Sequence, residues 1–554
     1  MIQFKTIDGL LLRDMVIAGA AILEKNRETV DALNVFPVPD GDTGTNMSLT
    51  MQSATREINS GEFIRADEAA NALAKGALKG ARGNSGVITS QLFRGFAKAL
   101  KGIDKITPVQ FAEALSKGAE VAYKAVMKPK EGTILTVARV VAEDAVKQAQ
   151  KNPDDYDALI DVMLKSGAAI LKKTPDMLPA LKQAGVVDSG GRGLLYIYQG
   201  YAAVLRGEDL ALAEKEEESV VSAEDDWHDL TRDLIYTYCL SFSITRFRED
   251  SDEHDLDSFR RRLNRIGNCV QVTGDLSGAD VHVHTNNPGS ALEYGLELGE
   301  IDRVKIDNLA EMKRALDKEN NIQTETPAEP ETSLPPKDFG MITVSLGEGF
   351  TSFFKDLNVD QIVEGGQTMN PSVDDLLNAL NQVNAEHVFI LPNNGNVIFA
   401  ANQAAQLCKK DVHVIPTKNV AMGIAAAIAF QPDASVEENI NRMNEASEHV
   451  KTATVTYAIR DSEYNGVSIR QGDIIGLHNG KIEKSGQSVK DVVLDTLSNV
   501  VTEEDELITI YYGADVTEND ASELASIIEN EYGNCDVEYH NGGQPLYYYI
   551  ISVE

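Results

Sequence analysis

Two aspartates near the start of the chain, Asp40 and Asp42, stand where a predicted helix begins. They belong to the segment from Asn34 to Met47, in which two prolines end the preceding helix and Gly41 and Gly44 let the backbone approach a ligand. Free amides at a helix start attract anions, and carboxylate oxygens suit Mg²⁺, which binds nucleotide phosphates. The segment therefore predicts a site for a metal-bound phosphate, although a turn at Asp40-Gly41 followed by an N-cap at Asp42 or Thr43 explains it equally well on its own.

Two further segments repeat this arrangement. Arg-Gly-Asn-Ser-Gly at 82–86 and Asp-Ser-Gly-Gly-Arg-Gly at 188–193 each join a helical stretch to the start of another. Three glycine-rich helix starts within the first two hundred residues predict that several helix N-termini converge on one polyanion. The sequence contains no Gly-x-x-x-x-Gly-Lys-Ser/Thr motif, so a P-loop is excluded.

The three segments together resemble the nucleotide-binding domain of the dihydroxyacetone kinase L-subunit (DhaL, DAK2) family. The form Asn-Val-Phe-Pro-Val-Pro-Asp-Gly-Asp-Thr-Gly-Thr-Asn-Met is specific to the version found in the ATP-binding subunit of bacterial fatty acid kinase. The resemblance extends along essentially the whole chain and is strongest over residues 30–195. It implies an antiparallel helical barrel with ATP bound at one end.

The motif residues then take roles around ATP and Mg²⁺. We expect Asp40 and Asp42 to bind Mg²⁺ and to be catalytic, and either Asn34 or a water to complete the metal shell, because the third aspartate of the wider family is missing between Leu33 and Asp40. Arg192 is expected to stabilise the transition state, with an ion pair that anchors its helix as the alternative. The expected nucleotide contacts, of which those from 132 onward follow from the resemblance alone, are Thr43, Gly44, Thr45, Asn46, Asn84, Ser85, Gly132, Thr133, Asp188, Ser189 and Gly190.

Composition limits the partners and the compartment. The formal charge of −35, from 86 acidic and 51 basic residues, disfavours nucleic acid and anionic lipid. Four widely spaced cysteines and a start without an apolar core favour a reducing, cytoplasmic location. The longest apolar run, at 420–430, is well below the ~20 residues that a membrane-spanning helix needs.

The hydrophobic pattern divides the 554 residues into three domains. An all-helical ATP- and Mg²⁺-binding domain is predicted for residues 1–206, followed by an acidic linker at 207–226. A small α/β domain is predicted for 227–318, and a Pro-, Glu- and Thr-rich disordered tether for 319–337. Strand and helix patterns then alternate over 338–554, which predicts an α/β domain that resembles the DegV family of fatty-acid-binding proteins.

The middle domain contains a candidate zinc site. His282 and His284 are two apart on a predicted strand, so both imidazoles face one side, where Cys239 of a neighbouring strand could join them. Polar residues on a strand face beside a buried cysteine are the alternative. The resemblance favours Zn²⁺, although Leu240 and Ser241 stand where the family commonly has Thr-Glu.

In the C-terminal domain, two loops rich in small polar residues resemble ligand-site loops of the DegV family. They span 364–372 and 391–397. Ordinary turns before helices are the alternative, and no catalytic residue is assigned to this domain.

The resemblance implies one half of a two-component kinase. The chain would phosphorylate the carboxylate of a fatty acid, presented by a separate DegV-like carrier protein, to give an acyl phosphate. Because the carboxylate is already ionised at neutral pH, metal and cations rather than a strong base should set the rate. The alternatives are a kinase of a small hydroxylated substrate such as dihydroxyacetone, and a non-catalytic ATP-binding scaffold. A homodimer is expected from the resemblance alone.

Overall fold

The first two hundred residues fold as helices, as their apolar periodicity predicts. In the computed structural model, the described residues are 4–35, 41–126, 128–208, 238–248, 253–275, 278–308, 336–366, 369–458, 462–464 and 467–554. The helices of this part are α1 (Gly9–Lys25), α2 (Arg27–Ala32), α3 (Thr43–Asn59), α4 (Ala66–Lys79), α5 (Gly83–Ala99), α6 (Pro108–Ala125), α7 (Ile134–Lys151), α8 (Tyr156–Leu171), α9 (Thr174–Met177), α10 (Pro179–Ala184) and α11 (Ser189–Arg206).

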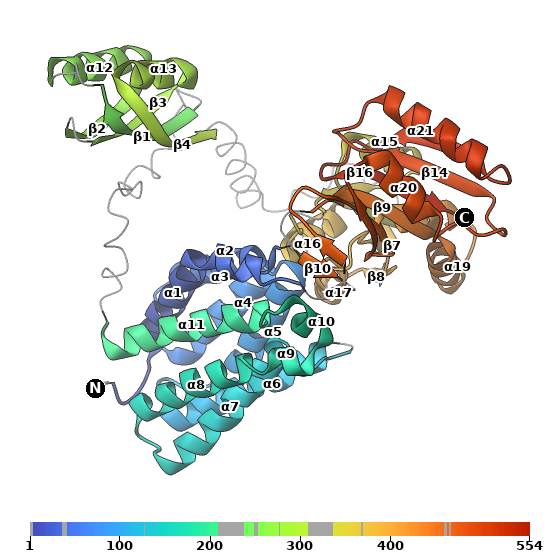
Figure 1. The fold of residues 1–554 in the computed structure, drawn as a ribbon. Helices are drawn as coiled ribbons and strands as arrows, with labels where there is room; N and C mark the ends of the chain where they lie inside the picture. The colour runs from blue at the N-terminus through green and yellow to red at the C-terminus, as the bar shows by residue number, and fades with distance from the viewer. Residues whose placement is uncertain are drawn as a thin grey trace. The chain divides into compact units, whose positions relative to one another are not determined.

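The long helices form a closed ring. Helices α3 to α8 each pack against the next long helix in the chain, α8 packs against α11, and α1 lies between α11 and α3 (Figure 1). The apolar faces of these helices meet in one core, in which Met15, Met47, Phe111 and Tyr156 are almost fully buried. This ring is the helical barrel that the sequence resemblance predicts.

The chain divides into two compact units, Met1–Leu210 with Pro335–Glu554, and Ala211–Leu334. Almost all of the predicted linker at 207–226 lies outside the described residues, and the same holds for the predicted tether at 319–337. Asp40 also lies outside them. None of the helices in the described part of the chain combines the length and the apolar character that crossing a bilayer requires.

The smaller unit is a four-stranded antiparallel sheet with two helices packed against it. Leu240 and Phe242 on β1 are buried beside Phe259 and Leu263 of α12, so the helices cover one face of the sheet (Figure 1). The strand order is β2-β3-β1-β4. The elements are β1 (Tyr238–Phe247), α12 (Glu253–Ile266), β2 (Gly267–Asp275), β3 (Gly278–Thr285), α13 (Pro288–Leu298) and β4 (Gly299–Asn308).

The described C-terminal part contains two large sheets and a separate two-stranded sheet, β10-β11. The first is parallel, with the order β6-β5-β7-β8, and the second has the order β13-β12-β9-β16-β14-β15. Its elements are β5 (Lys337–Ser345), α15 (Glu348–Asp356), β6 (Gln361–Glu364), α16 (Val373–Gln382), β7 (Ala385–Leu391), α17 (Ile398–Leu407), β8 (Asp411–Val414), α18 (Val420–Ala429), α19 (Val436–His449), β9 (Lys451–Tyr457), β10 (Ser462–Tyr464), β11 (Val467–Ile469), β12 (Ile474–His478), β13 (Lys481–Gly486), α20 (Val489–Leu497), β14 (Leu507–Tyr512), α21 (Glu518–Glu531), β15 (Asp536–Asn541) and β16 (Tyr547–Val553).

The predicted fold class, an all-helical N-terminal domain followed by α/β domains, is therefore confirmed.

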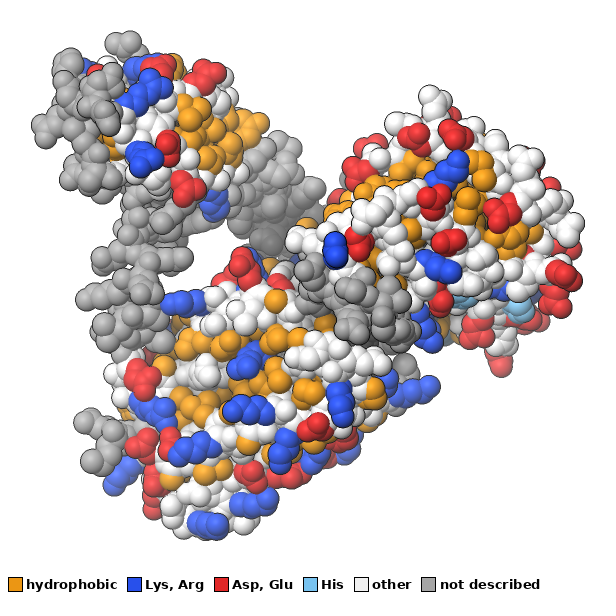
Figure 2. All heavy atoms as spheres, viewed as in Figure 1, with side chains coloured by type: hydrophobic (Ala, Val, Ile, Leu, Met, Phe, Trp, Pro, Cys, Tyr) orange, Lys and Arg blue, Asp and Glu red, His pale blue; other side chains and the backbone are white. Residues whose placement is uncertain are grey.

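On the face shown in Figure 2, acidic and basic side chains are interspersed over the helical domain.

Candidate functional site

The start of α3 is bound by an aspartate that the sequence analysis did not single out. The carboxylate of Asp31, on α2, accepts hydrogen bonds from the amides of Gly44 and Thr45 at 2.6 and 3.1 Å and from Thr45 Oγ1 at 2.9 Å. Desolvation by burial raises the pKa of Asp31, although these hydrogen bonds act in the opposite direction. Two of the amides that the sequence assigned to phosphate therefore already have a carboxylate acceptor.

The start of α5 approaches α3 closely. Gly83 has a φ of +56°, in the left-handed region that favours glycine, and a Cβ there would lie 2.5 Å from Asn46 Nδ2. This glycine allows the predicted ligands Asn84 and Ser85 to begin α5 directly beside Asn46.

The start of α11 completes the third side. Asp188 caps α11 by accepting a hydrogen bond from the amide of Gly191 at 2.7 Å, and Ser189 Oγ donates to Thr43 Oγ1 at 3.2 Å. Burial raises the pKa of Asp188 to about 7. Burial thus disfavours the negative charge of this carboxyl.

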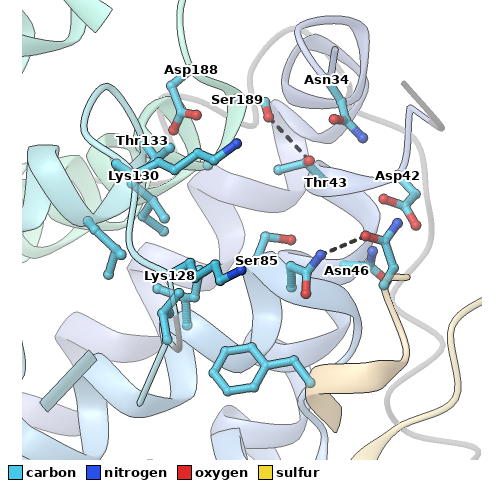
Figure 3. Close-up of a pocket in the computed structure, with 18 residues that line it drawn as sticks. Asn34, Asp42, Thr43, Asn46, Ser85, Lys128, Lys130, Thr133, Asp188 and Ser189 are labelled. Carbon is cyan, nitrogen blue, oxygen red and sulfur yellow. Dashed lines mark hydrogen bonds between the residues drawn. The ribbon is translucent and has the colours of Figure 1, made fainter. Parts of the chain in front are cut away.

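The three helix starts surround one cavity of about 290 Å³ (Figure 3). Its lining residues are Asn34, Asp42, Thr43, Asn46, Asn84, Ser85, Ile88, Val126, Lys128, Lys130, Thr133, Ile134, Leu135, Asp188, Ser189, Gly190, Asn396 and Phe399. Most of the predicted site residues thus meet at one place, as the convergence argument predicts. Gly44, Thr45, Gly132 and Arg192 do not line the cavity.

Arg192 neither lines the cavity nor forms the ion pair that was its alternative role, as far as the described residues show. Its Cζ lies 5.9 Å from the centre of the Tyr196 ring, and its buried Nε donates no hydrogen bond to any described residue. Among the described residues no carboxylate forms an ion pair with it. Its catalytic role stays a prediction.

Two lysines that the sequence analysis missed line the cavity instead. Lys128 and Lys130 lie in the connection before α7, and Figure 3 shows both ammonium groups directed into the cavity. The signal was present in the sequence, because Lys-Pro-Lys stands just before the Gly132-Thr133 element that was assigned to the nucleotide.

The donor chemistry of the cavity suits a hard cation. Asp42 is 9% exposed and Asn34 is 2% exposed, and each offers side-chain oxygens, as do Asn84 and Ser85. Carboxylate, amide and hydroxyl oxygens are the ligands that Mg²⁺ prefers. The residues present therefore fit a Mg²⁺ ion that accompanies a nucleotide, with Asp42 as its anionic ligand.

The C-terminal domain also reaches this site. Asn396 and Phe399, at the start of α17, line the cavity, and Asn370 Nδ2 donates to Asp42 Oδ2 at 2.6 Å. Neither contribution was predicted from the sequence.

The candidate zinc residues lie on two neighbouring strands of the middle sheet. Cys239 on β1 pairs in register with His284 on β3, and Ser241 pairs with His282. His282 and His284 alternate with the buried Val283, so both imidazoles lie on the opposite face of the strand. The two imidazole rings are 5.0 Å apart, and Ser241 Oγ lies 3.1 Å from His282 Nδ1. The Cys239 side chain lies outside the described structure.

A second cluster capable of binding a metal lies on the parallel sheet of the C-terminal domain. His387 Nδ1 and His413 Nε2 lie 2.7 and 2.9 Å from Asp411 Oδ2. Hydrogen bonds from the two imidazoles, that of His387 first, lower the pKa of Asp411. The sequence analysis did not single out these residues.

Comparison with known proteins finds family matches in three successive parts of the chain. Three family models match: the DAK2 domain over residues 37–203, the FakA-like middle domain of fatty acid kinase over 235–316, and the FakA-like C-terminal domain of fatty acid kinase over 340–554. Protein YloV of Bacillus subtilis is 42% identical over 563 aligned residues, covering 100% of both chains. An uncharacterized protein of Staphylococcus saprophyticus is 40% identical and covers 99% of both chains.

Solved structures match only parts of the chain. A DegV family protein from Corynebacterium glutamicum is 17% identical and covers 40% of this chain and 97% of its own, with a TM-score of 0.32. The dihydroxyacetone kinase of C. freundii is 18% identical and covers 36% of each chain, with a TM-score of 0.27.

Fold and site together define a multidomain kinase in which a helical DAK2 domain precedes two α/β domains. The chain belongs to the FakA-like family of fatty acid kinase proteins. It is thus a phosphotransferase, and the matching families imply ATP as its phosphoryl donor.

Proposed function

We propose that this chain transfers the γ-phosphoryl group of ATP to the carboxylate of a fatty acid held by a separate DegV-like carrier protein. A bond forms between a carboxylate oxygen and the γ-phosphorus, the bond from that phosphorus to the β,γ-bridging oxygen breaks, and acyl phosphate and ADP leave. The observation that carries this proposal is the convergence of three helix starts and two lysines on one cavity rich in oxygen donors.

The side chains of the cavity divide the work of phosphoryl transfer, which depends on positioning and charge neutralisation. Bound Mg²⁺ would neutralise phosphate charge, and Asp42 is its expected ligand, with Asp40 predicted from the motif. Thr43, Asn84 and Ser85 orient phosphate oxygens by hydrogen bonds. Lys128 and Lys130 reduce the repulsion between the incoming carboxylate and the γ-phosphate.

One assay tests the proposal against its alternatives. The full chain is incubated with ATP, Mg²⁺, oleate and a DegV-like carrier, and acyl phosphate is trapped with hydroxylamine. We expect acyl hydroxamate that requires both the ATP and the carrier. Phosphorylation of dihydroxyacetone in the presence of its own carrier protein, without hydroxamate, would favour the small-substrate kinase. ATP binding without either product would favour the scaffold.

We also propose that the middle domain binds Zn²⁺ through Cys239, His282 and His284. The register that pairs Cys239 with His284 supports this set, since these are ligand types that zinc prefers. The contact between Ser241 and His282 is of the kind that orients a ligating imidazole.

Zinc analysis of the purified chain checks this site. We expect about one zinc per chain in the wild type and a loss of most of it in His284→Ala, because two ligands rarely retain the ion. His387→Ala is the matched control, since it removes an imidazole from the C-terminal cluster. If zinc is lost in His387→Ala but retained in His284→Ala, the ion binds at the C-terminal cluster and the proposed ligands are wrong.

A further inference from the structure

The C-terminal loop between β6 and α16 contacts the expected metal ligand of the helical domain. Asn370 is 1% exposed, and its Nδ2 donates to Asp42 Oδ2 at 2.6 Å, although the two residues are 328 positions apart in the chain. Both belong to the same compact unit. The loop resembles ligand-site loops of the DegV family in its sequence, but its Asn370 contacts a residue that lines the cavity of the helical domain.

The backbone around Asn370 is held in place by the start of α5. Arg82 donates to the carbonyl oxygen of Asn370 at 2.8 Å and lies 3.4 Å from the carboxylate of Asp375. The amide of Val373 donates to the carbonyl oxygen of Ala81 at 3.2 Å. The position of the Asn370 amide is therefore fixed relative to the helical domain.

A second loop of the C-terminal domain reaches the same cavity. Asn84 Nδ2 donates to Asn396 Oδ1 at 2.7 Å, and Phe399 lines the cavity wall. Further along α5, Gln91 Nε2 donates to Gln403 Oε1 at 3.0 Å. This contact is buried and does not line the cavity. The interface thus has a part that touches the site and a part that does not.

From these contacts we infer that Asn370 is a positioning residue of the kinase site, supplied by the C-terminal domain to orient the Asp42 carboxylate for the metal-nucleotide. This inference rests on the proposed function. A donor on Oδ2 restricts the rotation of the carboxylate. Because an amide is neutral, it fixes the carboxylate without cancelling the charge that attracts Mg²⁺, whereas an ammonium or guanidinium there would compete with the metal.

The side-chain oxygen of Asn370 is also consistent with this role. Asn370 Oδ1 is buried and accepts no hydrogen bond from a described residue. Buried polar atoms normally have a partner, so this oxygen has acceptor capacity that a water or the bound metal-nucleotide could use.

The test measures Mg²⁺-dependent binding of a fluorescent ATP analogue to the full chain. In Asn370→Ala and the near-isosteric Asn370→Leu, we expect the Mg²⁺ concentration for half-maximal binding to rise about 10-fold or more, as for other residues that orient metal ligands. Binding without Mg²⁺ should stay within about twofold, because the nucleotide contacts themselves remain. Turnover of each variant should recover at high Mg²⁺.

Gln403→Ala is the matched control, because it weakens the same interface without touching the cavity. Its Mg²⁺ dependence is expected to match the wild type. Unchanged Mg²⁺ dependence in both Asn370 variants, while Asp42→Asn loses it, would overturn the role of Asn370 and leave the nucleotide site standing. An equal shift in Gln403→Ala would also overturn it, in favour of a general effect of the interface. A wild-type chain without Mg²⁺-dependent binding would overturn the proposed function itself.

Discussion

Exchange of Asp42 for asparagine is expected to lower acyl phosphate formation about a thousandfold. Asp42 is the anionic side chain at the start of α3 that lines the cavity, and loss of its charge weakens the binding of Mg²⁺ in the transition state. A loss of about 4 kcal/mol of transition-state stabilisation corresponds to this factor. Hydroxamate formation at saturating carrier and oleate measures it. The sequence motif predicts a comparable loss for Asp40→Asn.

Asparagine is preferred to alanine here because it preserves the domain contact. Its side-chain oxygen can still accept the hydrogen bond from Asn370, so the exchange removes charge with little change in packing. Asp155→Asn is the matched control: Asp155 caps α8 by accepting from the amide of Ala158 at 3.0 Å and does not line the cavity. Turnover above a third of the wild-type value in Asp42→Asn, with a normal Asp155→Asn, would rule out Asp42 as the principal metal ligand.

The sequence predicted the parts of the site that depend on local pattern. Glycine, hydroxyl and amide residues at helix starts are a local signal, and three such starts, at Thr43, Gly83 and Ser189, do meet at one cavity. Apolar periodicity likewise predicted the helical domain and the change to strands after it, because burial of one helix face or one strand face leaves a period in the sequence.

The parts that it missed depend on tertiary contacts. Asp31 precedes the motif on a separate short helix, and nothing in its neighbourhood indicates that it caps α3 across thirteen residues. The contact between Asn370 and Asp42 joins two domains, so no local pattern could reveal it. The Asn370 loop does have the small polar composition of a ligand site, but composition does not say which ligand or which domain it faces.

The direction of the cationic side chains of the site likewise could not be predicted from local sequence. Arg192 lies two residues after Gly190 in the same motif, yet closeness in sequence does not determine which side of α11 an arginine occupies. The structure directs Lys128 and Lys130 into the cavity from a connecting segment, where side-chain direction has no periodicity to reveal it.

Replacing both lysines with alanine is therefore expected to reduce kcat/KM about 100-fold. Each ammonium group that pairs with a phosphate or carboxylate oxygen of the bound substrates is expected to contribute about 1.5 kcal/mol, or roughly tenfold. The loss should be larger at low salt, because screening weakens the attraction in the wild type. Steady-state assays with varied ATP and salt measure both effects.

The double exchange to arginine separates charge from packing, and Arg192→Ala compares the two sources of charge. Lys128→Arg with Lys130→Arg retains two cations at the mouth of the cavity, so it should keep most of the activity. Arg192 does not line the cavity, and its exchange for alanine is expected to cost less than the double lysine exchange. If Arg192→Ala instead loses more activity at unchanged thermal stability, the transition-state cation is the one that the sequence motif predicted. The lysines would then serve only to attract the anionic substrates to the cavity.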